Sequence, residues 1–75
     1  MVRRQIAYQP GSRVRWANAE GASDGVIRKV FTHRLERTLN GATVTRPANR
    51  RNPAYLIEKD CGLQLLLNHS DLIPV

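Results

Sequence analysis

The chain has 75 residues, of which 41% are hydrophobic and 24% are charged, and its formal net charge is +6. This length allows one domain, and a single cysteine excludes an internal disulfide. The two histidines lie far apart in the sequence, so we expect neither a metal site nor another cofactor. No apolar run is long enough for a signal peptide or a membrane span, which favours a soluble, cytoplasmic protein.

Turns that contain glycine, proline or asparagine divide the chain into short apolar segments. This spacing is typical of an all-β sandwich or barrel, and no stretch has an apolar stripe of helical period over three turns. We interpret residues 1–10 as an N-terminal arm and residues 11–75 as the folded domain.

The first predicted strand covers residues 12–16, in which Val14 and Trp16 alternate with arginines. After a polar loop, Gly25 opens a second strand that covers residues 26–34. The alternation of this strand changes phase near residues 28–29, which predicts a bend or a bulge.

A tight hairpin is predicted at Asn40-Gly41, because both central positions of a type I′ turn require a positive φ. Its arms are residues 38–39 and 42–45. Pro47 ends the second arm, since it has no N–H to give to a strand ladder. The residues from 48 to 53 then form a basic loop.

Two further strands are predicted at residues 54–58 and 63–67, the second apolar on both faces and therefore central or covered. Residues 68–71 predict one turn of 3-10 helix, in which oxygens of Ser70 or Asp71 cap backbone N–H groups. Together these segments predict a small five-stranded SH3-like, or Tudor-like, barrel with one short 3-10 turn near the C-terminus.

Four segments in order, GSRVRW, GVIRKV, NGATVTRPANRRNPAYLIEKDCG and LLLNHSDLIPV, resemble the Tudor domain of the hypervirulence-associated protein family. That family is a small bacterial and fungal domain of unknown function, and the resemblance covers roughly residues 11–75. It implies an SH3-like barrel that acts as a binding module. The chain departs from the family pattern at residues 48–52, which are basic where family members are usually acidic, and at residues 67–69, where they tend to have a lysine.

Basic residues gather in the middle of the chain, where residues 28–51 contain seven cations and one acid, Glu36. Such a segment attracts polyanions, and guanidinium groups suit phosphate and carboxylate. We therefore predict a nucleic-acid-binding face that is tolerant of sequence. Its expected residues are Arg28, Lys29, Arg46, Arg50 and Arg51. A solvated basic surface without a partner is the alternative interpretation.

A groove of aromatic side chains at one end of the barrel is a second possible site, and it would use Trp16, Phe31 and Tyr55. A cage for a methylated cation also needs an acidic neighbour, whereas the nearby loops are basic. Trp16 alternates in phase with Val14, and Tyr55 with Ile57, so positions in the core are the competing interpretation for both.

No catalytic residues are expected. His69, Ser70 and Asp71 are neighbours on a tight turn and cannot aim at one another as a triad, and Cys61 has no evident base. An enzymatic alternative remains, because residues 63–66 have a short resemblance to the Val-Gln-Ile-Tyr strand of type II dihydrofolate reductases. An acidic protein surface and further copies of the chain in a homo-oligomer are the alternative partners.

Overall fold

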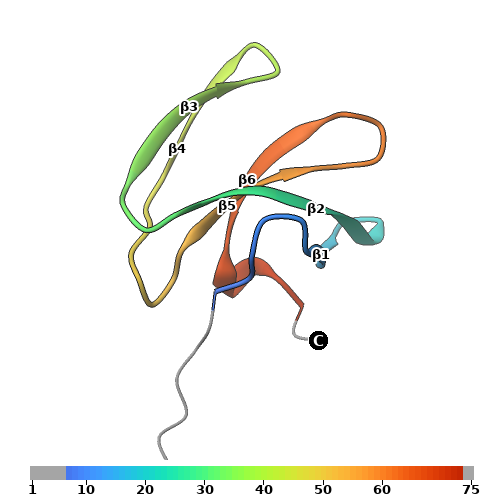
Figure 1. Cartoon of the computed structure of the whole chain (residues 1–75). Helices are drawn as coiled ribbons and strands as arrows, with labels where there is room; N and C mark the ends of the chain where they lie inside the picture. Colours follow the sequence, from blue (N-terminus) through green and yellow to red (C-terminus); the bar gives the residue numbers. More distant parts are fainter. Residues whose placement is uncertain (1–6, 74–75) are drawn as a thin grey trace, which may run out of the picture.

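The computed structural model describes residues 7–73, and these are all-β apart from one short 3-10 helix (Figure 1). The strands are β1 (Arg13–Asn18), β2 (Gly21–Phe31), β3 (Leu35–Leu39), β4 (Ala42–Arg46), β5 (Ala54–Glu58) and β6 (Gln64–Asn68), and the helix is η1 (His69–Asp71). The predicted all-β class and the predicted 3-10 turn are confirmed.

The strands form two sheets and do not close into one barrel. The larger sheet has the order β1-β2-β5-β6 with antiparallel pairing, and β3 and β4 form a separate hairpin. The predicted five-stranded barrel is therefore wrong in two respects. There are six strands in the described residues, because both arms of the Asn40-Gly41 hairpin are strands in their own right. The strand expected over 26–34 ends at Phe31, and β3 begins at Leu35. The sheets stay open because no strand ladder joins β4 to β6.

A long hairpin replaces the polar loop that the sequence predicted before Gly25. β1 and β2 stay paired as far as Asn18 and Gly21, with the turn at Ala19–Glu20. The Oδ1 atom of Asn18 accepts the N–H of Glu20 at 2.9 Å, and Gly21 has a φ of 121°, in the region that favours glycine. The polar residues thus close a tight turn and the strands extend further than their hydrophobic pattern indicates.

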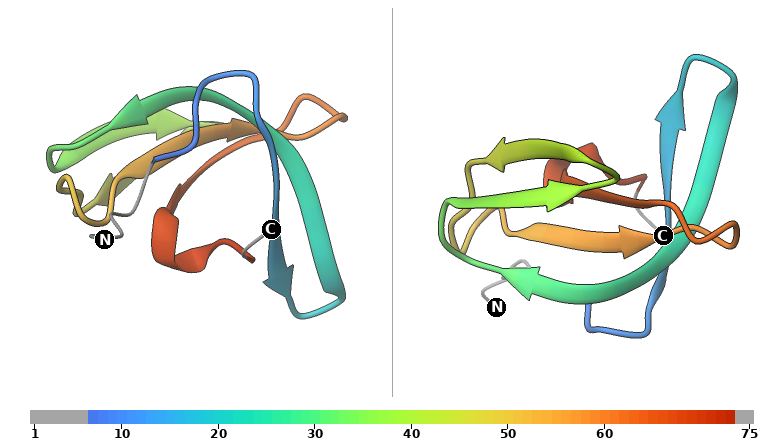
Figure 2. Two further views of the ribbon diagram at one scale, coloured as in Figure 1. Left: turned by 60° about the horizontal axis from the view of Figure 1, so that its bottom comes forward. Right: turned by 90° about the horizontal axis from the view of Figure 1, so that it is seen from above.

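The strand β2 bends between its pairing with β1 and its pairing with β5, so the β1–β2 hairpin turns away from the rest of the sheet (Figure 2). The register with β5 shifts between Ile27 and Lys29, which confirms the predicted bulge. Gly25 lets the strands approach closely beside this bend, because a Cβ atom there would lie only 2.8 Å from the carbonyl oxygen of Glu58.

The hairpin tip at Asn40-Gly41 has the predicted geometry. The φ angles of Asn40 and Gly41 are 52° and 81°, both positive as a type I′ turn requires. Leu39 and Ala42 face each other across this turn, which fixes the register of β3 and β4.

The core lies on both faces of the central strand β5. Its residues Tyr55 and Ile57 belong to one cluster, which also contains Val14, Trp16, Ile27 and Leu72. Leu56 points to the opposite face, where it packs with Leu66 and with Leu39 of the hairpin. The β3–β4 hairpin therefore covers the second face of the sheet. The strand β6 is covered, as one of the two predicted alternatives stated, but it lies at the edge of the sheet.

Both ends of the described chain pack against the larger sheet. Tyr8 contacts the first core cluster, and residues 1–6 of the expected N-terminal arm lie outside the described residues. Near the other end, Leu72 forms one bridge with Trp16, and the N–H of Ile73 donates to the carbonyl of Arg15 at 2.8 Å. Within residues 7–73, no helix has the length and apolar character needed to cross a bilayer.

Candidate anion-binding surface

The loop of residues 47–53, which joins β4 to β5, carries the exposed pair Arg50 and Arg51. Asn49 holds the loop locally, because its Oδ1 atom accepts the N–H groups of Arg51 at 2.9 Å and of Asn52 at 2.8 Å. A turn of this kind orders a short loop without strand pairing.

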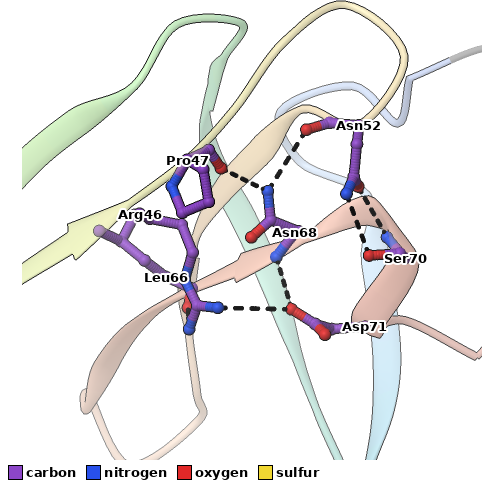
Figure 3. Close-up of polar contacts among 7 residues, drawn as sticks. All are labelled: Arg46, Pro47, Asn52, Leu66, Asn68, Ser70 and Asp71. Atoms are coloured by element: carbon purple, nitrogen blue, oxygen red, sulfur yellow. Dashed lines mark hydrogen bonds and ion pairs between the residues drawn. The ribbon is translucent and has the colours of Figure 1, made fainter.

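Side chains from β6 and η1 attach this loop to the larger sheet, as Figure 3 shows. The buried Asn68 donates from Nδ2 to the carbonyl oxygens of Pro47 at 2.7 Å and Asn52 at 3.3 Å. Asn52 donates from its own Nδ2 to Ser70 Oγ at 3.1 Å, and its Oδ1 accepts the N–H of Ser70 at 3.0 Å. The loop is therefore ordered by hydrogen bonds within itself and by hydrogen bonds to β6 and η1.

Asp71 caps the start of η1, as the sequence predicted. Its Oδ2 atom accepts the backbone N–H of Asn68 at 2.9 Å. The hydroxyl of Ser70, the other predicted cap, accepts from Asn52 instead and so belongs to the loop attachment.

The strand register brings a second basic segment to the same end of the molecule. Phe31 pairs with Ala54, and Leu35 pairs with Arg46, so the turn of residues 32–34 lies beside the loop 47–53 (Figures 1 and 2). That turn contributes the exposed Arg34. We call the three residues Arg34, Arg50 and Arg51 the cationic end.

Two of the five cations predicted for the binding face form ion pairs or hydrogen bonds with neighbouring groups of the protein. The Nε atom of Arg28 lies 2.9 Å from Glu58 Oε1. Arg46 donates from Nη2 to the carbonyl of Leu66 at 2.9 Å, and its Nη1 lies 3.8 Å from Asp71 Oδ2.

The other three predicted cations, Lys29, Arg50 and Arg51, are exposed and make no ion pair with any described residue. Arg34, which belongs to the basic segment but is not among the five expected residues, has the same property. The structure thus brings Arg50 and Arg51 together with Arg34, and it places Lys29 on β2, two residues before the end of that strand.

Acidic side chains gather beyond the opposite end of β5, where the β1–β2 hairpin and the β5–β6 turn meet. Arg13 contacts Asp24 at 3.0 Å and Asp60 at 3.4 Å there. The hydrogen bond to Asp24, followed by the one to Asp60, raises the pKa of Arg13 above its usual value. Arg13 at this end is neutralised by carboxylates, whereas the arginines of the cationic end have no such partner among the described residues. Glu36, exposed on β3, is the acidic residue nearest to Arg34 in the sequence.

The three aromatic residues predicted to form a groove are divided between the two faces of the sheet. Trp16 and Tyr55 are 6% and 0% exposed and lie in the first core cluster. Phe31 packs against the second cluster, where the guanidinium carbon of Arg37 lies 5.7 Å from its ring centroid. Within residues 7–73 the three rings therefore share no groove, and the core accounts for Trp16 and Tyr55.

The asparagines that order the arginine loop were not found by reasoning from the sequence. A local signal existed for Asn49, because an asparagine two residues before an N–H that it can accept is typical of a turn. Nothing local indicated Asn68, whose partners lie 16 and 21 residues away along the chain.

The sequence pattern of the family described as "Hypervirulence associated proteins TUDOR domain" matches residues 11–72. The chain belongs to this family. The match begins just before β1, includes every strand, and ends at Leu72, which bridges back to Trp16. The predicted resemblance is thereby confirmed. Comparison with curated proteins and with solved structures gave no match.

In this hypervirulence-associated Tudor domain, the loop 47–53, the turn 32–34 and η1 all lie inside the matched residues. The cationic end is therefore part of the domain itself. A Tudor-like domain of this size points to a small binding module.

Proposed function

We propose that this Tudor domain is a non-enzymatic binding module that holds a polyanion at its cationic end, with nucleic acid as the first candidate. One observation carries the proposal: the turn with Arg34 lies beside the loop with Arg50 and Arg51, and none of the three has an ion pair with a described carboxylate, while Asp24 and Asp60 lie at the other end. Guanidinium groups that are not neutralised within the protein are available to phosphate oxygens.

The ordered loop favours binding, because less conformational freedom is lost when the arginines meet their ligand. The side-chain bonds from Asn68 and Asn52 supply that order before any ligand arrives. Since Trp16 and Tyr55 are buried, they offer no surface on which bases stack. Contacts to the sugar-phosphate backbone therefore dominate, and binding is tolerant of sequence.

The proposal is tested with the double substitution Arg50→Glu and Arg51→Glu. Its matched control is Arg15→Glu with Lys59→Glu, which makes the same change in net charge with two cations that form no ion pair and lie at the acidic end. Affinity for labelled DNA and RNA oligomers is measured by fluorescence anisotropy at about 50 mM salt. We expect the first variant to lose at least about tenfold in affinity and the control to keep most of it.

Two results would contradict the proposal. One is an absence of oligomer binding by the unmodified chain at this low salt concentration. The other is an equal loss in both double variants, which would assign binding to net charge alone. Dihydrofolate-dependent loss of NADPH absorbance would contradict the non-enzymatic part of the proposal.

A further inference from the structure

The strands β4 and β6 lie next to each other where the two sheets meet, and we call this boundary the seam. No backbone hydrogen bonds close the barrel there, and side chains of the hairpin bond to β6 in their place. Asn40 donates from Nδ2 to the carbonyl of Gln64 at 2.9 Å. Arg46 donates from Nη2 to the carbonyl of Leu66, also at 2.9 Å (Figure 3). Two alternate carbonyls of β6 are thus occupied by side chains of the hairpin.

The free edge of β6 can be assigned from the alternation of its bonds to β5. The N–H of Lys59 donates to Leu63, and the N–H of His69 donates to Pro53, which places the odd-numbered residues of β6 in the hydrogen-bonded pairs. The N–H and C=O groups of Gln64 and Leu66 therefore point away from β5. No hydrogen bond among the described residues uses either N–H.

A cavity of about 390 Å³ lies along this seam. Its lining is apolar at Leu39, Ala42, Val44 and residues 65–67, and polar at Asn40, Arg46 and Gln64. We call this cavity the edge groove. It lies on the hairpin side of the molecule and is separate from the loop that carries the cationic end.

The guanidinium group of Arg46, in the edge groove, has a donor that forms no hydrogen bond. Its Nε atom is buried and has no hydrogen-bond partner. Its Nη1 atom lies 3.8 Å from Asp71 Oδ2, which is too long for a hydrogen bond. A buried donor without a partner is costly, so the guanidinium gains a charge-assisted hydrogen bond if it leaves the carbonyl of Leu66 and meets the carboxylate of a ligand.

We propose that the edge groove binds an extended segment of a partner protein, which pairs with the free edge of β6 and places an acidic side chain against Arg46. On binding, the peptide's N–H groups take over the carbonyls of Gln64 and Leu66, and the peptide's carbonyls accept the N–H groups that now lack partners. The released guanidinium of Arg46 turns to the acidic side chain. Addition of a strand to a free sheet edge is a general mode of peptide recognition.

The hydrogen-bonding groups of the edge favour a peptide over other occupants. An occupant that displaces Asn40 and Arg46 must replace their donors at the carbonyls of Gln64 and Leu66, and a phosphodiester backbone offers acceptors alone. A second copy of the chain would bring a net charge of +6 against a groove that contains Arg46. An acidic peptide supplies donors, acceptors and the complementary charge together.

The first experiment uses the full chain and a five-residue peptide, capped at both ends, in which valine alternates with aspartate. A peptide with asparagine in place of aspartate is the neutral control. Binding and amide hydrogen exchange are followed by NMR. We expect the acidic peptide to bind about tenfold more tightly than the neutral one and to protect the N–H groups of Gln64 and Leu66. Binding of the acidic peptide without protection of these two groups would overturn the proposal, as would no binding.

Peptides that are N-methylated test the strand pairing itself. In an extended strand only every second N–H faces β6. Methylation of one alternate set should therefore abolish binding, while methylation of the other set is tolerated. Equal tolerance of both sets would overturn strand addition.

Variants of the protein locate the site. Arg46→Met should lower affinity for the acidic peptide about tenfold and should not lower affinity for the neutral peptide, because it also removes the side chain that occupies the carbonyl of Leu66. Ala42→Phe fills the groove from β4 and should abolish binding of both peptides, whereas Thr43→Phe, on the opposite face of β4, should not. Unchanged binding by Ala42→Phe would overturn the proposal even if Arg46→Met proves unstable.

Two further outcomes distinguish the edge groove from the cationic end and from self-association of the chain. The variant with Arg50→Glu and Arg51→Glu should keep its peptide binding, because those arginines lie outside the groove. Loss of peptide binding in that variant would assign the peptide to the cationic end and overturn the proposal. Protection of Gln64 and Leu66 that rises with protein concentration and without peptide would also overturn it, by assigning the groove to a second copy.

Discussion

The hydroxyl of Tyr55 lies 2.7 Å from Nδ1 of His69 and joins the central strand to the 3-10 helix. The same hydroxyl accepts the backbone N–H of Tyr8 at 3.1 Å, and the ring of Tyr8 stacks on the imidazole with centroids 5.1 Å apart. The hydroxyl therefore shares one hydrogen bond with the backbone of Tyr8 and a second with the imidazole of His69. One buried side chain thus fixes both the residues before β1 and the helix η1.

Replacement of Tyr55 by phenylalanine should destabilise the domain by about 1–3 kcal/mol, because the N–H of Tyr8 and the imidazole of His69 both lose their partner. The free energy of unfolding is measured with urea. The control is Tyr8→Phe, which keeps the backbone N–H and the stacked ring and should change stability by less than about 0.5 kcal/mol. Equal stability of Tyr55→Phe and the unmodified chain would show that this bond has no net effect.

Stability should also depend on pH through this residue. Burial raises the pKa of Tyr55 above its usual value of 10.0, against the opposing effect of the hydrogen bond from Tyr8. The folded domain therefore keeps this proton more tightly than the unfolded chain does. The stabilisation that the protonated Tyr55 hydroxyl provides is intact below about pH 10, and it is lost as the pH rises through the pKa of Tyr55 in the folded state.

Urea unfolding of the unmodified chain and of Tyr55→Phe measures this effect. The stability difference between them should be constant from about pH 7 to pH 9 and should shrink above about pH 10. A stability difference between the two proteins that grows as the pH rises would contradict a raised pKa of Tyr55 in the folded state.

The attachment of the arginine loop depends on donation by the side chain of Asn68. In Asn68→Asp, a carboxylate oxygen replaces the amide nitrogen and faces the carbonyls of Pro47 and Asn52. We expect a loss of about 1–3 kcal/mol in the free energy of unfolding, together with faster amide exchange in the loop 47–53. Asn68→Ala, which removes the donor without adding charge, is the comparison. An Asn68→Asp domain as stable as the unmodified chain would contradict the role of this donor.

Salt dependence gives a quantitative test of the contacts at the cationic end. If Arg50 and Arg51 each neutralise one phosphate, replacing both by alanine should reduce the slope of log affinity against log salt concentration by about two. The slope is obtained from anisotropy titrations between about 50 and 200 mM salt. Arg28→Ala is the matched control, since Arg28 is already paired with Glu58, and its slope should be unchanged.

Much of the strand layout follows from local sequence. The alternation around Val14 and Trp16, the Asn40-Gly41 turn and the break at Pro47 each depend on residues that are close along the chain, and each appears in the structure. Sequence reasoning was wrong about the closure of the sheet, because closure depends on whether β4 and β6 meet through backbone groups. Here Arg46 and Asn40 occupy the carbonyls of β6 that a strand would need.

The candidate site was predicted less completely. The arginine pair at 50–51 was identified from its charge and from the loop that carries it. The sequence did not predict which cations remain without an ion pair. Arg28, for example, contacts Glu58 only because a strand pairing brings together residues that are 30 positions apart in the sequence. Arg34 belongs to the basic segment but was not among the five expected residues, since its turn comes to lie beside the loop 47–53 only through the pairing of β2 with β5 and of β3 with β4.

The sequence by itself determined the all-β class, the tight turns, the excess of positive charge and the family, because these follow from residue type and from spacing over a few positions. Only the tertiary structure decided which arginines face solvent without a carboxylate and which seam of the sheet stays open. Both depend on strand register, which brings together residues that local patterns leave independent.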